Sequence, residues 1–208
     1  MLTFLIGLIG QGFFFARTLV QWLLSEHYKK VLSPSLFWVF SLTGACVFFF
    51  YGWLRHDFSI ILGQSITYFI YIWNLKIKGA WNKIPIWIRL VLYLLPAVLI
   101  GYFTRDINHF ALTFFGRKDI PFGLIVFGSV GQIIFTLRFV YQWYYSYHKH
   151  YSILPAEFWY ISLLGSFIII IYAIIRHDLV LMLGQSVGLI AYIRNVMIGW
   201  KELKKDQN

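Results

Sequence analysis

The chain has 208 residues, of which 60% are hydrophobic, 21% aromatic and only 12% charged, with a mean hydropathy of +0.70. Soluble domains carry about 25% charged residues, so this composition excludes an ordinary soluble domain and indicates an integral membrane protein. The net charge of +10 then favours contact with anionic lipid head groups, and we expect no nucleic-acid partner.

The sequence offers no metal-ligand cluster and no catalytic arrangement. Its single cysteine, Cys46, lies in an apolar run, which excludes a disulfide framework. The six histidines lack the spacing of zinc ligands. No nucleophile stands beside a base, so we expect no catalytic residue, no cofactor and no enzymatic activity.

Seven apolar segments follow one another along the chain, and each has about the ~20 residues that a helix needs to cross ~30 Å of hydrocarbon. A helix is expected because an open strand would leave backbone groups unpaired in lipid. The first segment lacks the basic start and cleavage site of a signal peptide, so we expect a permanent helix. The segments are residues 2–24, 36–54, 58–77, 86–103, 121–145, 157–175 and 179–199.

A constant offset of 121 relates residues 10–74 to residues 131–195, with 25 of 65 positions identical. This is a duplicated three-helix unit. Three helices reverse sidedness, so two copies lie parallel only if one more helix joins them, and residues 86–103 supply it. We predict an all-α membrane fold with two parallel three-helix bundles and a linker helix. The predicted regions are a first repeat (1–79), a linker helix and extracytoplasmic loop (80–120), a second repeat (121–200) and a basic cytoplasmic tail (201–208).

Charges between the segments predict the orientation, because cytoplasmic loops carry more lysine and arginine. The side opposite the N-terminus has nine such residues and the N-terminal side has five, so we expect an outside N-terminus and a cytoplasmic C-terminus. The nine are Lys29, Lys30, Lys76, Lys78, Lys83, Lys149, Lys201, Lys204 and Lys205, and the five are Arg55, Arg105, Arg117, Lys118 and Arg176.

The first segment of each repeat carries an arginine at membrane depth. Steps of seven and four residues place Gly10, Arg17, Gln21 and Ser25 on one helix face. A charge at this depth costs roughly 2.5–3.5 kcal/mol, so it is rarely kept without a use. The planar guanidinium can hold a phosphate with two hydrogen bonds. The alternatives are snorkelling to the head groups or a buried carboxylate pair. The candidate phosphate-binding residues are Arg17, Gln21, Arg138 and Gln142.

The third segment of each repeat carries a polar stripe. Together with one glutamine from each first segment, it predicts a polar pocket whose lining residues are Gln11, Gln64, Tyr71, Asn74, Gln132, Gln185, Tyr192 and Asn195. The alternative is hydrogen bonding between helices, worth only ~0.6–2 kcal/mol in membranes. Gly44 and Gly165 are expected to allow close helix packing.

Each repeat places an Arg-His-Asp triplet in the short turn between its second and third segments: Arg55, His56 and Asp57, then Arg176, His177 and Asp178. We expect a helix cap and a local ion pair, and an extracytoplasmic gate or phosphate contact is the alternative. Four tryptophans, Trp22, Trp38, Trp143 and Trp159, are expected to anchor the membrane interface.

The repeated run Gly-Gln-x-x-Phe-x-x-Arg-x-x-x-Gln-Trp-x-x-Ser, followed by Pro-x-x-Phe-Trp, Arg-His-Asp, Gly-Gln-Ser and a late Asn, resembles the lipid-A-disaccharide synthase N-terminal domain family. The resemblance covers residues 10–76 and 131–197. It implies a relation to the sugar-transporting SWEET and PQ-loop proteins and their three-one-three fold. SWEET proteins bind sugar through an asparagine on the corresponding third helix. The Pro-Gln pair of PQ-loop helices is missing here, and Arg17 and Gln21 occupy roughly that place.

Three functions compete. The leading hypothesis is a bacterial inner-membrane transporter or flippase for a lipid-linked sugar or glycolipid, such as a polyprenyl-phosphate sugar or a lipid A-related molecule. The alternatives are a non-catalytic membrane subunit that assists a glycosyltransferase, and a free-sugar permease. The family name comes from fusions to a glycosyltransferase. The chain ends nine residues after Gly199, so we expect disaccharide synthase activity not to carry over. The expected partners are membrane lipid, the lipid-linked sugar or glycolipid and, under one alternative, a glycosyltransferase.

Overall fold

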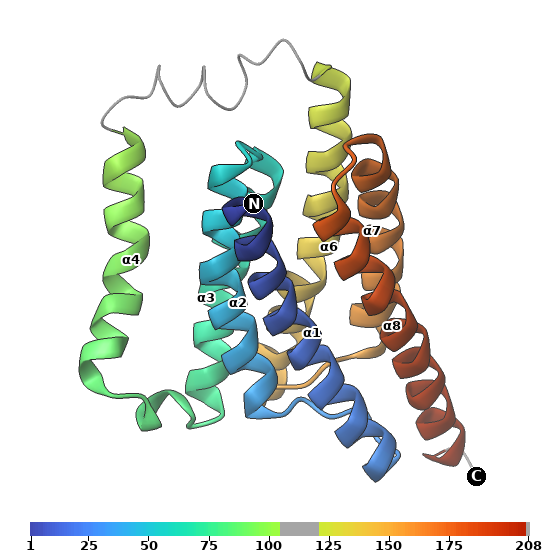
Figure 1. The fold of residues 1–208 in the computed structure, drawn as a ribbon. Helices are drawn as coiled ribbons and strands as arrows, with labels where there is room; N and C mark the ends of the chain where they lie inside the picture. Colours follow the sequence, from blue (N-terminus) through green and yellow to red (C-terminus); the bar gives the residue numbers. More distant parts are fainter. Residues whose placement is uncertain (105–120, 207–208) are drawn as a thin grey trace.

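The structure is a computed structural model that describes residues 1–104 and 121–206. The regular elements of these residues are helices, which confirms the prediction of an all-α protein (Figure 1). Each predicted segment corresponds to one α-helix. In chain order the elements are α1 (Leu2–Tyr28), α2 (Ser35–Leu54), α3 (Phe58–Ile77), the short 3-10 helix η1 (Trp81–Lys83), α4 (Ile86–Thr104), α6 (Phe122–Lys149), α7 (Ala156–Ile175) and α8 (Leu179–Asp206).

Five of the described helices, α1, α2, α6, α7 and α8, are long and apolar enough to cross a membrane. Residues Ile86–Pro96 of α4 form a shorter apolar stretch. Helix α3 carries polar side chains, among them Gln64, Thr67 and Asn74, between its apolar ones. The described helices are therefore those of a membrane protein, and the crossing of all seven segments stays a prediction.

Two units of three helices face each other. Helix α2 packs against α1 and α3, and α7 packs against α6 and α8. The units meet where α1 packs against α8 and where α3 packs against α6. Helices α1 and α6 start at the same end of the molecule, and α4 lies on the outer side of the first unit (Figure 1). The predicted domain boundaries stay predictions, and Arg105, Arg117 and Lys118 lie outside the described residues.

The turns between the second and third helices of the two units have the same conformation. His56 and His177 adopt a left-handed backbone with φ of 52° and 48°. The amide of Asp57 then donates to the Gly52 carbonyl at 2.9 Å, as the amide of Asp178 does to Ala173. This hydrogen-bond pattern ends a helix and satisfies carbonyls that would otherwise lack a partner. The duplicated triplets therefore set both turns.

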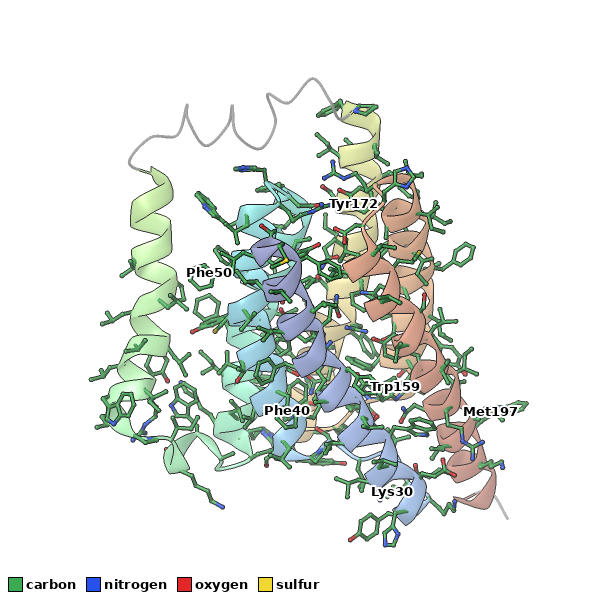
Figure 2. All side chains as sticks on the ribbon, in the orientation of Figure 1. Lys30, Phe40, Phe50, Trp159, Tyr172 and Met197 are labelled. Atoms are coloured by element: carbon green, nitrogen blue, oxygen red, sulfur yellow. The ribbon has the colours of Figure 1, made fainter. Side chains whose placement is uncertain are left out.

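An aromatic core lies where the two units meet. Trp38 and Trp159, at 0% and 1% exposure, are among its most buried side chains. The expectation that these two tryptophans anchor the membrane interface is wrong, since packing inside the bundle takes them away from the head groups. Figure 2 shows Trp159 and Tyr172 among the helices, with Lys30 and Met197 at the periphery.

Helix α4 is tied to the first unit through a break in its own hydrogen bonding. Pro96 has no amide hydrogen to donate to the carbonyl of Leu92. The hydroxyl of Tyr68 on α3 donates to that carbonyl instead, at 2.6 Å. An apolar groove of about 260 Å³ separates α4 from α2 and α3, and Phe50 on its wall points towards α4 (Figure 2).

Candidate functional site

A cavity of about 360 Å³ lies between the two units, bordered mainly by α1, α3, α6 and α8. This volume falls in the range of small-ligand sites, about 300–1,000 Å³. Its polar lining comes from both repeats, and most of these residues belong to the predicted site. The polar lining residues are Gln11, Arg17, Thr18, Gln64, Thr67, Tyr71, Gln132, Thr136, Arg138, Gln185 and Tyr192.

Arg17 enters the cavity from α1. Only 5% of its surface is exposed, so it does not snorkel to the head groups. Its Nη1 donates to the hydroxyls of Ser41 and Tyr71, each at 3.2 Å. The guanidinium carbon also lies 4.5 Å from the centre of the Phe14 ring. Neutral hydroxyls and an aromatic ring therefore hold this charge inside the bundle.

Arg138 is the repeat-related partner of Arg17 and is 1% exposed. Its Nη1 donates to Ser162 at 3.2 Å, which reproduces the Arg17–Ser41 bond. The guanidinium carbon lies 3.4 Å from the ring centre of Phe135 and 4.7 Å from that of Phe139. Arg17 lies 5.3 Å from the same Phe139 ring. The two cations therefore share one aromatic side chain at the centre of the molecule.

Neither buried cation is neutralised within the part of the chain that the structure describes. The salt bridges there join other pairs, so neither Arg17 nor Arg138 contacts a carboxylate. The Nε atoms of both arginines are buried and make no hydrogen bond in the protein. An uncompensated buried charge is costly, and buried charges are normally paired. The arrangement is suited to an anion that enters the cavity.

Two glutamines add acceptors beside these donors. Gln64 and Gln185 are repeat-related, line the cavity and are more than nine-tenths buried, yet the Oε1 of each has no partner in the protein. Sugar hydroxyls can donate to such amide oxygens. Gln11 packs on Gly184 and Gln132 on Gly63, so these two glutamines line the cavity where the repeats touch.

Four other predicted site residues form two buried amide pairs outside the cavity lining. Gln21 Nε2 donates to Asn195 Oδ1 at 2.8 Å, and Asn195 Nδ2 returns a bond to Gln21 Oε1 at 3.1 Å. Gln142 and Asn74 repeat this exchange at 3.0 and 3.1 Å. All four are 0% exposed. The pairs tie α1 to α8 and α6 to α3, and a direct substrate role for these four residues stays a prediction.

The aspartates of the two Arg-His-Asp turns cap the helices that follow them. Asp57 accepts from the backbone amide of Ile60, and Asp178 accepts from those of Val180 and Leu181. These bonds cap α3 and α8.

The same aspartates also accept hydrogen bonds from the other repeat. Tyr51 donates to Asp178 and Tyr172 donates to Asp57, each at 2.9 Å. Arg55 pairs with Asp178 at 3.0 Å, so this ion pair joins the two repeats and is not the local one that the sequence suggested. The proposed gating role of the triplets stays a prediction.

Sequence reasoning missed Phe139 and Thr18 as site residues. They occupy the same position of the two repeats, immediately after each arginine. Both line the cavity, and Phe139 is 2% exposed with its ring centre 5.0 Å from that of Tyr71. The sequence could have revealed them, because the residue that follows the repeated arginine differs between the two copies.

Comparison with known proteins gives the family context of this fold. The family described as "Lipid A Biosynthesis N-terminal domain" matches residues 6–76 and 127–197, one match in each repeat. The chain is 30% identical to a lipid-A-disaccharide synthase of Chlamydia felis and 32% identical to those of Chlamydia caviae and Chlamydia abortus. Each alignment covers 95% of this chain and 33% of the relative. The chain thus spans about a third of the length of these relatives. No solved structure matches the chain.

These comparisons support the resemblance to the lipid-A-disaccharide synthase N-terminal family, and they give a lipid A biosynthesis context. They also correct one expectation. The prediction that the chain has no enzymatic activity is contradicted, because proteins that share this region are named as an enzyme. The search for a nucleophile beside a base tested only one kind of catalytic arrangement. Such a search cannot show that a membrane region is related to part of an enzyme.

Proposed function

We propose that this chain, which belongs to the Lipid A Biosynthesis N-terminal domain family, binds the phosphorylated head group of a lipid-linked sugar or glycolipid and moves it across the bacterial inner membrane. The substrate class under this proposal is a polyprenyl-phosphate sugar or a lipid A-related glycolipid. Arg17 and Arg138 bind the phosphate, and the amides of Gln64 and Gln185 contact sugar hydroxyls.

The observation that carries the proposal is the pair of buried, uncompensated arginines in one cavity. An uncharged sugar needs no cation, and an arginine is costly to insert into a membrane. A phosphate removes that cost by supplying the missing negative charge, and it suits the guanidinium because two hydrogen bonds can form at once. The open Nε atoms and amide oxygens add the donors and acceptors that a phosphorylated sugar needs.

The repeat architecture supports transport. Parallel repeats related by an axis along the membrane normal are found in transporters, with the binding site at their interface. The cavity here is lined by both repeats, and buried hydrogen bonds join the repeats beside it. We propose that α1–α3, α4 and α6–α8 form the three-one-three arrangement of SWEET and PQ-loop proteins.

We propose that the C-terminus is cytoplasmic and the N-terminus periplasmic, from the excess of lysine and arginine on one side. Fusion of alkaline phosphatase after Asn208 is then expected to give no activity, because this enzyme needs the oxidising periplasm. Fusion of a fluorescent protein at the same position is expected to give full fluorescence. The reverse pattern contradicts this orientation.

The function is tested with purified protein in phosphatidylcholine liposomes that contain a polyprenyl-phosphate sugar labelled on the sugar. Chemical quenching from outside reports how much label has changed leaflet. We expect the wild type to move the label and Arg17→Lys and Arg138→Lys to slow it about 10- to 100-fold, since hydrogen bonds to charged groups are worth about 1.5–3 kcal/mol. Arg89→Lys on α4 makes the same chemical change outside the cavity and is the matched control.

Two results would overturn the proposal. One is uptake of glucose or sucrose that does not depend on either arginine, because this identifies a free-sugar permease. The other is full movement of the labelled lipid by both lysine variants, because this removes the arginines from the site.

A second candidate function rests on the length of the relatives. Because the chain corresponds to about a third of proteins named lipid-A-disaccharide synthase, it is also a candidate for the membrane part of such a synthase, one that presents a glycolipid to a glycosyltransferase. Copurification of a glycosyltransferase, with synthase activity that depends on this chain and no leaflet exchange in liposomes, would favour this candidate.

A further inference from the structure

The two contacts between the repeats are related by the duplication, but the cavity reaches the surface at only one of them. Its exposed lining residues belong to α1 and α8, and include Leu8, Phe15, Leu183, Val187 and Ile190. Phe15 is 50% exposed and Ile190 63%. On the α3–α6 side the lining residues are buried or half-buried.

One substitution between the repeats lies at this difference. Phe139 on α6 packs against Trp38 and Tyr71, with ring centres at 6.3 and 5.0 Å. Its counterpart on α1 is Thr18, a much smaller side chain whose hydroxyl bonds back to the Phe14 carbonyl at 2.9 Å. An aromatic ring therefore packs into the α3–α6 contact, whereas the equivalent position of the α1–α8 contact holds only a threonine.

A glycine extends the gap. Gly12 on α1 lines the cavity, and its counterpart is Ile133. A Cβ built on Gly12 would meet no atom within 4 Å, so this position borders open space. The missing side chain lies on α1, one of the two helices whose apolar residues are exposed at this contact.

The cytoplasmic ends of the two contacts also differ. Glu26 on α1 accepts two hydrogen bonds from Arg194 on α8, at 2.8 and 3.0 Å. The counterparts of this pair are Tyr147 and Trp73, whose ring centres are 6.4 Å apart. Partly exposed ion pairs contribute little to stability, while packed aromatic rings bury apolar area. At this end the α1–α8 contact therefore relies on a polar pair where the α3–α6 contact relies on packed rings.

We propose that the lipid enters the cavity sideways from the bilayer between α1 and α8, with its hydrocarbon tail held in that contact while its head group reaches Arg17 and Arg138. This inference rests on the proposed function and specifies its entry route. The tail meets Phe15, Val187 and Ile190, which face the hydrocarbon, so it does not have to cross the polar cavity. The α3–α6 contact stays closed and acts as the hinge between the repeats.

The route is tested by filling it. Thr18→Phe places in the first repeat the ring that the second already has, and it is expected to slow leaflet exchange of the labelled polyprenyl-phosphate sugar at least tenfold. Thr43→Phe on α2 is the matched control, since Thr43 is exposed and bonds to its own i−4 carbonyl in the same way as Thr18. Exchange at the wild-type rate in Thr18→Phe would overturn the route.

A second measurement uses the unaltered protein. A polyprenyl-phosphate sugar with a diazirine in its tail is photolysed in phosphatidylcholine liposomes, with excess unlabelled lipid as competitor. Competed adducts are expected on α1 and α8, and fewer are expected with Arg17→Lys. Adducts on α3 and α6 would overturn the route while leaving the proposed function in place. No competed adduct and no exchange by the wild type would overturn both.

Discussion

The two repeats share their polar residues but not the side chains that surround them. Both keep the arginine with its serine partner, the glutamine–asparagine exchange and the aspartate that accepts from a tyrosine of the other repeat. They differ at Thr18 and Phe139 and at the pairs Glu26–Arg194 and Tyr147–Trp73. The shared residues give the cavity its charge and join the repeats by hydrogen bonds, and the differences lie at the two contacts between the repeats.

The largest effect is expected where a shared contact is broken. Asp178 accepts from Tyr51, caps α8 and pairs with Arg55, so Asp178→Ala leaves these groups without their acceptor. We expect a loss of about 3 kcal/mol in the free energy of unfolding, because the Tyr51 hydroxyl, the α8 amides and the partly exposed Arg55 lose their acceptor.

The matched variant Asp178→Asn keeps the size and one acceptor oxygen, but it loses the charge and replaces the second oxygen with an amide nitrogen that donates. Circular dichroism melting in detergent micelles should therefore rank the proteins as wild type, then Asn, then Ala. Equal melting temperatures for the Ala variant and the wild type would show that the ties across the repeats do not stabilise the fold.

A smaller loss of stability is expected from substitutions at Gly44 and Gly165, and it should differ between these two equivalent positions of the repeats. A Cβ on Gly165 would lie 2.7 Å from the backbone Cα of Phe135, whereas one on Gly44 would meet mainly the Phe14 ring, which can move. Overpacking typically costs about 1–3 kcal/mol, so Gly165→Ala is expected to fall in this range and Gly44→Ala below it. Melting of the two single variants side by side tests the order, and a larger loss for Gly44→Ala would contradict the packing described for α6 and α7.

The smallest effect concerns the pairs that differ. Arg194→Gln removes the partly exposed ion pair with Glu26, for which we expect a small loss of stability that fades in 1 M salt. Trp73→Leu in the other contact is expected to lower stability equally at both salt concentrations, because aromatic packing is not screened. A salt-dependent loss in Trp73→Leu, or none in Arg194→Gln, would remove this distinction.

The duplication allowed much of the fold to be predicted from the sequence. Apolar length predicted each helix, and the spacing of Gly10, Arg17, Gln21 and Ser25 predicted a face that is buried in α1. The tryptophans were misplaced because hydropathy does not distinguish a side chain at the head groups from one between helices. Trp38 and Trp159 are inside because aromatic side chains from both repeats pack around them.

The candidate site could be predicted only in part. The repeated Arg17 and Arg138 indicated a functional position, but sequence spacing does not show which partner each polar group takes. Gln21 thus pairs with Asn195 across 174 residues, a contact that only the packing of α1 on α8 creates. The difference between the α1–α8 and α3–α6 contacts was also not predicted. A search for identical residues in the two repeats does not consider positions such as 18 and 139, where the copies differ.

The central claim is that two buried arginines bind a phosphorylated head group, and equilibrium binding tests it most directly. Native mass spectrometry of the protein in detergent micelles, titrated with a polyprenyl-phosphate sugar, measures the affinity without any transport step. The account predicts saturable binding by the wild type and by Arg89→Lys, weakened about 10- to 100-fold in Arg17→Lys and Arg138→Lys. Equal affinity in all four proteins would contradict it.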